Sequence, residues 1–210
     1  MSYEQLKRGI DLCLAVFLGV IFLPVALLVA LAIKLESPAG PVLADTPPRV
    51  GRYGKRFNTF KFRSMIPDAV GYLKSHPQLL NRYKKSSFKL HDDPRVTRVG
   101  KFIRKFSLDE VPQFLNVLKG EMSLIGPRPY YADELAEQQQ KYPETQDLVR
   151  QALSVRPGIT GLWQVSGRSE VNFDRRIEMD AKYAAEHNLW YDLKILIKTP
   201  LVMLSGKGAV

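Results

Sequence analysis

Two adjacent carboxylates, Asp109 and Glu110, are the first candidates for chemistry in this chain of 210 residues. They lie in the segment Ser107-Leu108-Asp109-Glu110-Val111-Pro112, and the apolar positions that follow up to Gly120 have helical spacing. A carboxylate at the start of a helix keeps its charge readily, because that end of the helix dipole is positive. The same end of a helix binds phosphate groups. The pair is therefore typical of a site that acts on a phosphorylated substrate.

A purely structural role is the alternative interpretation of this segment. Ser107 followed by Glu110 three residues later has the spacing of a capping box. Pro112 argues against it, because with Ser107 as the cap the proline falls beyond the first turn and loses a helical hydrogen bond. With Asp109 as the cap, Pro112 lies inside the first turn. The two carboxylates would then point in different directions, and each could have its own role.

Arginines set beside proline and glycine accompany the pair. Arg104 precedes it, the segments Gly126-Pro127-Arg128-Pro129 and Arg156-Pro157-Gly158 follow, and Arg168 lies beyond them. A guanidinium binds two phosphate oxygens at once through its planar fork. One such arginine is typical of a solvated surface, but several in stiff segments predict prepared anion contacts. The sequence has no P-loop and no glycine-rich dinucleotide fingerprint.

The composition indicates one basic domain with an anionic partner. Lys and Arg number 31 against 21 Asp and Glu, which gives a net charge of +10 at pH 7. Nucleic acid, an acidic membrane surface and phosphorylated ligands all fit that charge. The single cysteine, Cys13, excludes an intrachain disulfide, and the three histidines have no partner at ligand spacing, so no zinc site is expected.

The longest apolar run, residues 12–33, could anchor these residues to a membrane. It contains no charge and would reach about 33 Å as a straight helix. No small-residue cleavage site follows it, which argues against a signal peptide. Pro24 predicts a kink or break in the middle, and Lys7, Arg8 and Lys34 at the two ends predict that both face the cytoplasm. A helix that enters, breaks and returns satisfies both features, and a kinked helix that crosses the bilayer is the alternative.

The rest of the chain is expected to place a few strands among helices. Residues 40–54 predict a loop or short hairpin, residues 56–62 and 159–165 predict strands, and residues 132–142 predict a helix. Residues 188–204 join tryptophan and leucine with lysine. That pattern fits a helix at a membrane interface and an ordinary core-facing helix equally well.

Six motifs follow one another in a characteristic order along the chain. They are Lys61-Phe62-Arg63-Ser64-Met65, Asp92-Asp93-Pro94-Arg95, Ser107-Leu108-Asp109-Glu110-Val111-Pro112-Gln113, Asn116-Val117-Leu118-Lys119-Gly120-Glu121-Met122-Ser123, Gly126-Pro127-Arg128-Pro129 and Arg156-Pro157-Gly158-Ile159-Thr160-Gly161. This series resembles the bacterial sugar transferase family, the monotopic polyprenyl-phosphate phosphoglycosyl transferases. An ordered series is far more specific than any single motif. The chain departs from the family pattern at residues 44–48, at Leu23 and at Glu121, and none of these departures touches the carboxylate pair.

The resemblance implies an α+β fold that is mostly helical. Residues 1–36 would form a re-entrant membrane helix-break-helix with its break at Leu23 and Pro24. Residues 37–210 would form a compact cytoplasmic, membrane-associated catalytic body with a small β-hairpin and interfacial amphipathic helices. The expected location is the cytoplasmic face of a bacterial inner membrane, held there monotopically, and the chain resembles the minimal catalytic form of the family.

The resemblance also implies a Mg²⁺-dependent dyad, in which Asp109 is the nucleophile and a metal ligand and Glu110 is the candidate base. Lys61, Arg104 and Arg128 are implied to contact phosphate or the nucleotide. Arg63, Arg156 and Arg168 are added as candidate substrate-binding residues.

The implied reaction transfers a hexose 1-phosphate from a UDP-sugar to polyprenyl (undecaprenyl) phosphate and releases UMP, as the first membrane step of bacterial glycan assembly. The expected partners are these two substrates and inner-membrane phospholipid, with a homodimer as an option and no nucleic acid beyond the nucleotide.

Two other functions explain part of the pattern. A non-catalytic binder of anionic lipid or nucleic acid explains the charge and the apolar anchor, and it predicts that replacing Asp109 leaves function intact. A metal-dependent phosphohydrolase explains the carboxylates, and it predicts release of free sugar phosphate without a lipid acceptor. Neither explains the ordered motifs.

Overall fold

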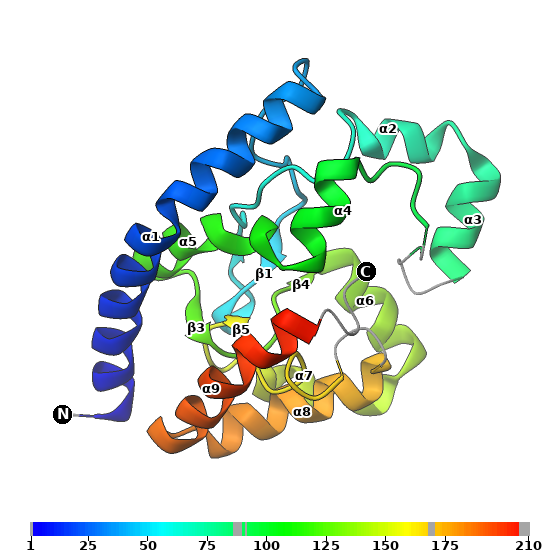
Figure 1. The fold of residues 1–210 in the computed structure, drawn as a ribbon. Coiled ribbons are helices and arrows are strands. Elements are labelled where there is room, and N and C mark those ends of the chain that lie inside the picture. The colour runs from blue at the N-terminus through cyan, green and yellow to red at the C-terminus, as the bar shows by residue number, and fades with distance from the viewer. Residues whose placement is uncertain (1, 86–89, 91, 168–170, 206–210) are drawn as a thin grey trace.

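A long N-terminal helix lies along one flank of a body of helices and short strands (Figure 1). The computed structural model describes residues 2–85, 90, 92–167 and 171–205. The mostly helical α+β character expected from the sequence is confirmed. The helices beyond the first are α2 (Ala69–Lys74), α3 (Pro77–Lys85), α4 (Arg98–Lys105), α5 (Phe114–Lys119), α6 (Ala132–Lys141), α7 (Gln146–Ala152), α8 (Phe173–Glu186) and α9 (Leu189–Ser205), with 3₁₀ turns η1 (Arg52–Gly54), η2 (Leu108–Gln113) and η3 (Pro143–Thr145).

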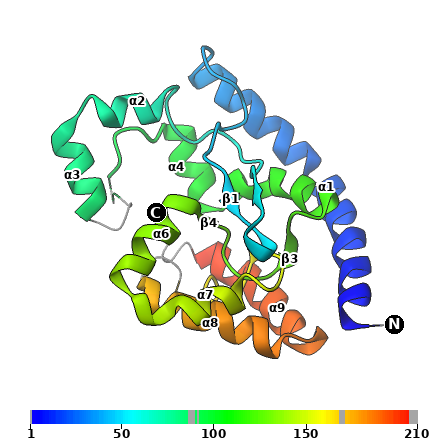
Figure 2. The ribbon, with the colours of Figure 1, turned by 180° about the vertical axis from the view of Figure 1, so that it is seen from behind.

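Helix α1 runs without interruption from Tyr3 to Glu36. Ser2 and Gln5 form a reciprocal capping box at its start. The helix continues through Pro24, and Figures 1 and 2 show that it bends along its length. The expected helix-break-helix is therefore corrected to one bent helix. Proline removes a single backbone hydrogen bond, and a bend relieves its clash with the preceding turn without separating the two halves.

Helix α1 turns a narrow face to the body and a wide apolar face outward. Among the described residues it alone is long and apolar enough to cross a bilayer. Asp11, Ala15, Val29 and Ile33 are buried against the body. The exposed apolar side chains include Val16, Phe17, Val20, Ile21, Leu23, Leu27, Leu28 and Leu31. An apolar surface of this extent associates the protein with a membrane.

The strands are short and form two small sheets. In the first, β1 (Arg49–Val50) pairs antiparallel with β2 (Arg56–Phe57) and with β4 (Tyr130–Tyr131). Turn η1 closes the β1–β2 hairpin, so a short hairpin is present, but it begins only at Arg49 and extends beyond the range 40–54 in which a loop or short hairpin was expected. In the second sheet, β3 (Ser123–Ile125) and β5 (Gly158–Thr160) run parallel. The strands predicted over residues 56–62 and 159–165 are therefore real but end early, because turns and loops take up the remainder.

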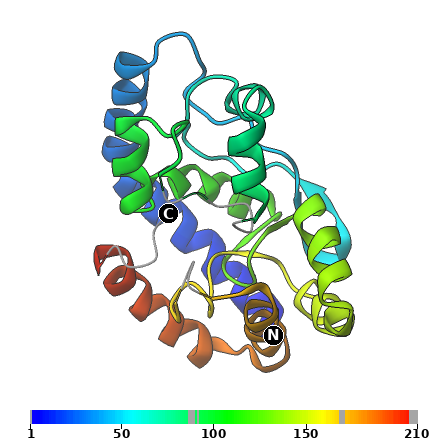
Figure 3. The same cartoon turned by 90° about the vertical axis from the view of Figure 1, so that its right-hand side faces the viewer.

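Three apolar clusters join these elements. The first packs α1, α5, β3, α8 and α9 together and includes Ala15, Val117 and Ile195. The second lies between α6, α7, α8 and the first sheet. The third joins the C-terminal half of α1 to α4 and η2 through Val29, Ile33 and Ile103. Figure 3 shows the resulting layout, in which α4 and α9 lie on the same side of the molecule.

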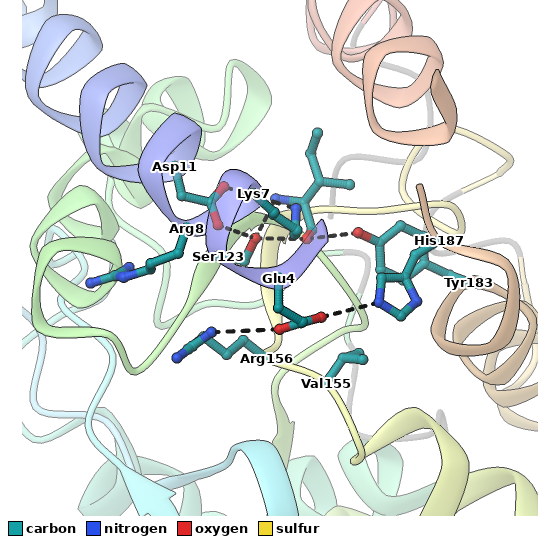
Figure 4. A pocket seen from close by; sticks show the side chains of 10 residues that line it. Glu4, Lys7, Arg8, Asp11, Ser123, Val155, Arg156, Tyr183 and His187 are labelled. Carbon is teal, nitrogen blue, oxygen red and sulfur yellow. Dashed lines mark hydrogen bonds and ion pairs between the residues drawn. The ribbon is translucent and has the colours of Figure 1, made fainter. Parts of the chain in front are cut away.

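Polar contacts fix the N-terminal end of α1 to the body. The Asp11 carboxylate accepts hydrogen bonds from Ser123 Oγ at 2.8 Å and from the Leu124 N–H at 3.2 Å. Lys7 Nζ lies 2.7 Å from an Asp192 oxygen. Figure 4 shows Asp11 and Lys7 in the small polar pocket between α1, β3 and α8. The fold thus holds this end of the helix by buried charges as well as by apolar packing.

The C-terminal end of α1 is fixed to the same body. Glu36 accepts hydrogen bonds from the N–H groups of Arg98 and Val99, at 2.8 and 2.9 Å, where α4 begins. These N–H groups have no partner within their own helix, so the carboxylate satisfies them. Both ends of α1 therefore contact one globular body.

Removing the buried carboxylate of Asp11 should destabilise the fold. We expect Asp11→Ala to lower the free energy of unfolding by about 1–3 kcal/mol, because a buried N–H and hydroxyl lose their acceptor. For a chain of this size each kcal/mol shifts the melting temperature by roughly 2–4 °C. Asp147→Ala is the matched control, since the Asp147 side chain is 88% exposed in a surface pair worth at most about 1 kcal/mol. Equal thermal stability of the two variants in detergent would contradict the stabilising role of the Asp11 carboxylate.

Candidate active site

The turn between α4 and α5 presents the two carboxylates. Ser107 takes a left-handed φ of 54°, and the 3₁₀ turn η2 begins immediately after it. Ser107 makes no cap hydrogen bond through its side chain, so the capping-box interpretation is wrong. Asp109 and Glu110 occupy the first turn of η2, as expected for a helix start, but the cap position is Ser107 and not Asp109, so the expectation of Asp109 as the cap is also wrong.

Pro112 determines what the Asp109 backbone can bind. In a 3₁₀ turn the carbonyl of Asp109 would accept from the N–H of residue 112, and proline has none. The carbonyl instead accepts from the Phe62 N–H at 2.9 Å. This hydrogen bond brings an extended segment from far earlier in the chain against the carboxylates and places Lys61 beside them.

The Lys61 ammonium lies between the two carboxylates but is much closer to one of them. Its Nζ is 2.5 Å from Glu110 Oε1 and 3.8 Å from Asp109 Oδ2. The three side chains are largely buried, with 20%, 32% and 13% of the side chains of Lys61, Glu110 and Asp109 exposed. Glu110 therefore holds the lysine, and Asp109 is the more weakly paired carboxylate.

The environment separates the two carboxylates electrostatically. Burial raises the pKa of Asp109 above its ordinary value, Lys61 opposes the rise, and Glu110 adds to it. Burial alone would also raise the pKa of Glu110, but the ion pair and hydrogen bond with Lys61 lower it overall. Neighbouring carboxylates with opposite shifts are typical of a site that assigns them different tasks. The pKa of Asp109 is thus shifted upward and that of Glu110 downward, by burial in the first case and by the ion pair with Lys61 in the second.

Arg104 of α4 is a second cationic residue near Asp109. Its Nε donates to Ser64 Oγ at 2.8 Å, and its charge lowers the pKa of Asp109. Helix α4 can approach this closely because of Gly100, where an added Cβ would lie only 1.9 Å from the Ser64 carbonyl oxygen. The structure thus brings Lys61 and Arg104 to the dyad.

Arg128 lies on the segment between two prolines. Its guanidinium lies 5.1 Å from the centre of the Trp163 ring, and its charge lowers the pKa of Glu110. Its backbone N–H donates to Asp180 Oδ2 at 3.2 Å, and Tyr130 Oη donates to the same oxygen at 2.8 Å. Asp180 is fully buried on α8 and therefore fixes the backbone that carries Arg128.

Two residues of this site were not found by sequence reasoning. Arg49 is 6% exposed, donates to the Pro129 carbonyl oxygen at 3.0 Å and lowers the pKa of Glu110. It lies in a stretch interpreted only as a loop or hairpin. Asp180 had a usable signal, because it lies with Ile177 and Ala181 on the apolar face of α8, where an unpaired carboxylate is rare.

The other predicted substrate contacts lie elsewhere. Arg63 donates to Ser37 Oγ and to its carbonyl oxygen, at 3.0 and 2.6 Å, and so fixes the loop after α1. Arg156 donates to the Gly120 carbonyl oxygen at 3.0 Å and lies 4.0 Å from Glu4, in the pocket of Figure 4. The structure does not bring either to the dyad. Arg168 lies outside the described residues, and Leu23 and Pro24 lie within α1.

The donor set of the dyad fits a magnesium ion that is shared with a substrate. Among the described residues there is no group of three or more acidic, histidine or cysteine side chains that could form a complete protein cage. Magnesium does not need one, since it is commonly held by one or two carboxylates together with substrate phosphates and water. Asp109 supplies such a carboxylate beside cationic groups suited to phosphate.

Comparison with known proteins decides the family. A family model described as "Bacterial sugar transferase" matches residues 2–206. The chain belongs to the bacterial sugar transferase family. This confirms the resemblance inferred from the ordered motifs.

Similar proteins occur in several bacteria. An undecaprenyl-phosphate galactose phosphotransferase of Salmonella typhimurium is 43% identical over 211 residues, covering 99% of this chain and 42% of the relative. A UDP-glucose:undecaprenyl-phosphate glucose-1-phosphate transferase of Escherichia coli is 37% identical, covering 97% and 41%. The exopolysaccharide production protein ExoY of Rhizobium meliloti is 39% identical, covering 95% and 86%. The chain thus spans less than half of the first two relatives and most of the third.

The buried carboxyl of Asp180 should give stability a characteristic pH dependence. Burial raises its pKa from 3.8 to about 7, so the folded state holds this proton more tightly than the unfolded chain. The contribution of Asp180 to stability is therefore fully present below the pKa of the unfolded state. It is lost as the pH rises through the pKa of the folded state.

We expect the melting temperature of the wild type to fall relative to that of Asp180→Asn as the pH rises from about 4 to about 8, because the amide does not titrate. Thermal unfolding of both proteins across this range measures the difference. A constant difference would show that Asp180 is not held in its neutral form.

Proposed function

We propose that this protein transfers a hexose 1-phosphate from a UDP-sugar to a polyprenyl phosphate of the undecaprenyl type. The observation that carries the proposal is the unequal Asp109–Glu110 pair, in which Lys61 binds Glu110 closely and leaves Asp109 more weakly paired, with a pKa that burial raises. Two similar proteins are named for transfer of galactose or glucose phosphate to undecaprenyl phosphate. A binder without catalysis has no use for such a pair.

The reaction proceeds in two displacements at one phosphorus atom. An Asp109 oxygen attacks the phosphorus that bears the sugar, the bond to the UMP oxygen breaks, and UMP leaves with that electron pair. A sugar-phosphoryl aspartate remains. An oxygen of polyprenyl phosphate then attacks the same phosphorus, which releases the Asp109 carboxylate and forms the polyprenyl-diphosphate sugar.

Glu110 and the cationic groups have separate tasks in these steps. Glu110 accepts the proton of the acceptor phosphate when that phosphate is protonated, and Lys61 keeps Glu110 ionised and oriented for it. Arg104 and Arg128, whose charges act on Asp109 and Glu110 respectively, stabilise the charge on the phosphoryl oxygens. A magnesium ion held by Asp109 and the diphosphate would neutralise further phosphate charge.

We further propose that the protein is monotopic on the cytoplasmic face of the inner membrane, with α1 re-entrant. Both ends of α1 make polar contacts with one body, at Asp11 and at Glu36. A helix that crossed the bilayer would carry one of these ends to the opposite side, away from its partners. Helix α9 supports the same placement, since Trp190, Ile197 and Leu201 are exposed and suit phospholipid at the interface.

The covalent route makes a direct prediction for Asp109. With UDP-sugar, Mg²⁺ and no acceptor, the wild type should release UMP in a burst and gain the mass of one hexose phosphate. Asp109→Asn keeps the shape but lacks the nucleophilic carboxylate, so we expect neither burst nor adduct. Intact-protein mass spectrometry and UMP quantification measure the two outcomes, and EDTA should abolish both in the wild type.

Glu110→Gln is the matched control, because the amide replaces a carboxylate of the same turn. It should retain the burst while transfer to the acceptor slows by about 10²- to 10⁴-fold, as expected for a lost general base. Turnover by Asp109→Asn, or an adduct on another residue, would refute the assigned nucleophile. Release of free sugar phosphate without acceptor would indicate a phosphohydrolase instead.

The membrane placement can be tested by labelling cysteines in intact cells. In a Cys13→Ser background, Ser2→Cys before α1 and Glu137→Cys on α6 should both resist an impermeant thiol reagent added from the periplasm, and both should react after permeabilisation. Reaction of Ser2→Cys alone from the periplasm would show that α1 crosses the bilayer.

A further inference from the structure

Helix α4 has two faces with opposite roles. Its inner face carries Ile103, which is buried against α1, and Arg104, which reaches Ser64 beside the dyad. Its outer face carries Lys101, Phe102 and Lys105, all exposed. The mechanism derived above uses only the inner face.

The outer face combines exposed aromatic surface with positive charge. The Phe102 side chain is 58% exposed, and its ring lies 5.0 Å from that of Phe106. Lys105 Nζ lies 5.5 Å from the Phe106 ring. The eight residues of α4 include four cationic side chains and no acidic one. Aromatic rings beside lysines suit an occupant that is apolar at one end and anionic at the other.

The position of α4 indicates which occupant that is. At its N-terminus α4 is bound to the end of the membrane helix through Glu36, and Val99 packs in the cluster with Val29 and Ile33. At its C-terminus α4 leads directly into η2, which presents Asp109. The helix therefore contacts the apolar anchor at one end and leads to the turn of Asp109 at the other.

We propose that the outer face of α4 is the docking surface for the lipid acceptor, an isoprenoid phosphate. The first isoprene units lie against Phe102 and Phe106, and Lys101 and Lys105 hold the phosphate before it reaches Asp109. This inference rests on the proposed function. Bulk phospholipid shares the same chemistry, but it has no need of a surface that ends at the nucleophile, and the apolar face of α9 is available to it.

The test compares acceptor kinetics with the first half-reaction in nanodiscs of phosphatidylethanolamine and phosphatidylglycerol. Phe102→Ala should raise the KM for undecaprenyl phosphate about tenfold, as expected when a contact of this size is lost. Lys101→Gln with Lys105→Gln should raise it to a similar extent. Both variants should release the UMP burst at the wild-type rate, which also reports that they are folded.

An acceptor with a short isoprenoid chain distinguishes the contribution of the aromatic residues from that of the lysines. With this acceptor the effect of Phe102→Ala should shrink, because fewer apolar contacts remain to be lost, while the effect of the lysine variant should persist.

Trp190→Ala on α9 is the matched control. Trp190 is 64% exposed and has Lys194 Nζ 5.6 Å from its ring, so it resembles the α4 pair but belongs to another helix. Its KM for acceptor should stay at the wild-type value.

Equal increases in the KM for acceptor in Phe102→Ala and Trp190→Ala would show general membrane contact and overturn the inference. So would unchanged acceptor kinetics in both α4 variants with the burst intact. Absence of hexose phosphate transfer to undecaprenyl phosphate by the wild type would instead refute the proposed function.

Discussion

The hydrogen bond from the Phe62 N–H to the Asp109 carbonyl oxygen is the contact on which the arrangement of the site depends. Pro112 has no N–H that could compete for this carbonyl oxygen inside η2. Once the bond is made, the extended segment on either side of Phe62 has a fixed register. Lys61 then reaches the carboxylates, and Arg63 reaches Ser37 at the end of the membrane helix. One backbone contact thus links the membrane anchor to the nucleophile and determines which carboxylate the lysine binds.

Contacts between helices also fix the positions of Arg104 and Arg128. Helix α4 is joined to α1 through Glu36 and to Ser64 through Arg104, so it cannot shift without moving the wall of the site. Asp180, which is fully buried, likewise holds the backbone of Arg128. The cations proposed to bind the substrate phosphates are therefore positioned by helices that are distant in sequence. Positioned charge of this kind needs little reorganisation when charge develops during a reaction.

Sequence reasoning found the features that are local and missed those that depend on packing. Asp109 and Glu110 were identifiable because a helix start and a proline lie within a few residues of them. Helix α6 and the helix at residues 189–205 followed from apolar spacing. Arg63 and Arg156 look like phosphate ligands in sequence, but both bind backbone carbonyl groups, and only the tertiary fold reveals those partners. Arg49 reaches the site through the pairing of β1 with β4, which no local pattern predicts. The break at Pro24 was overestimated, because proline alone does not separate two helical halves that are packed on one body.

The contacts at both ends of α1 also have a consequence for the depth at which Asp109 lies relative to the bilayer. Asp109 belongs to a turn that packs directly on the C-terminal half of α1, so the depth of the nucleophile relative to the bilayer is set when the chain folds. Under the proposed function, this fixed depth would favour an acceptor whose phosphate rests at the level of Asp109 in the membrane.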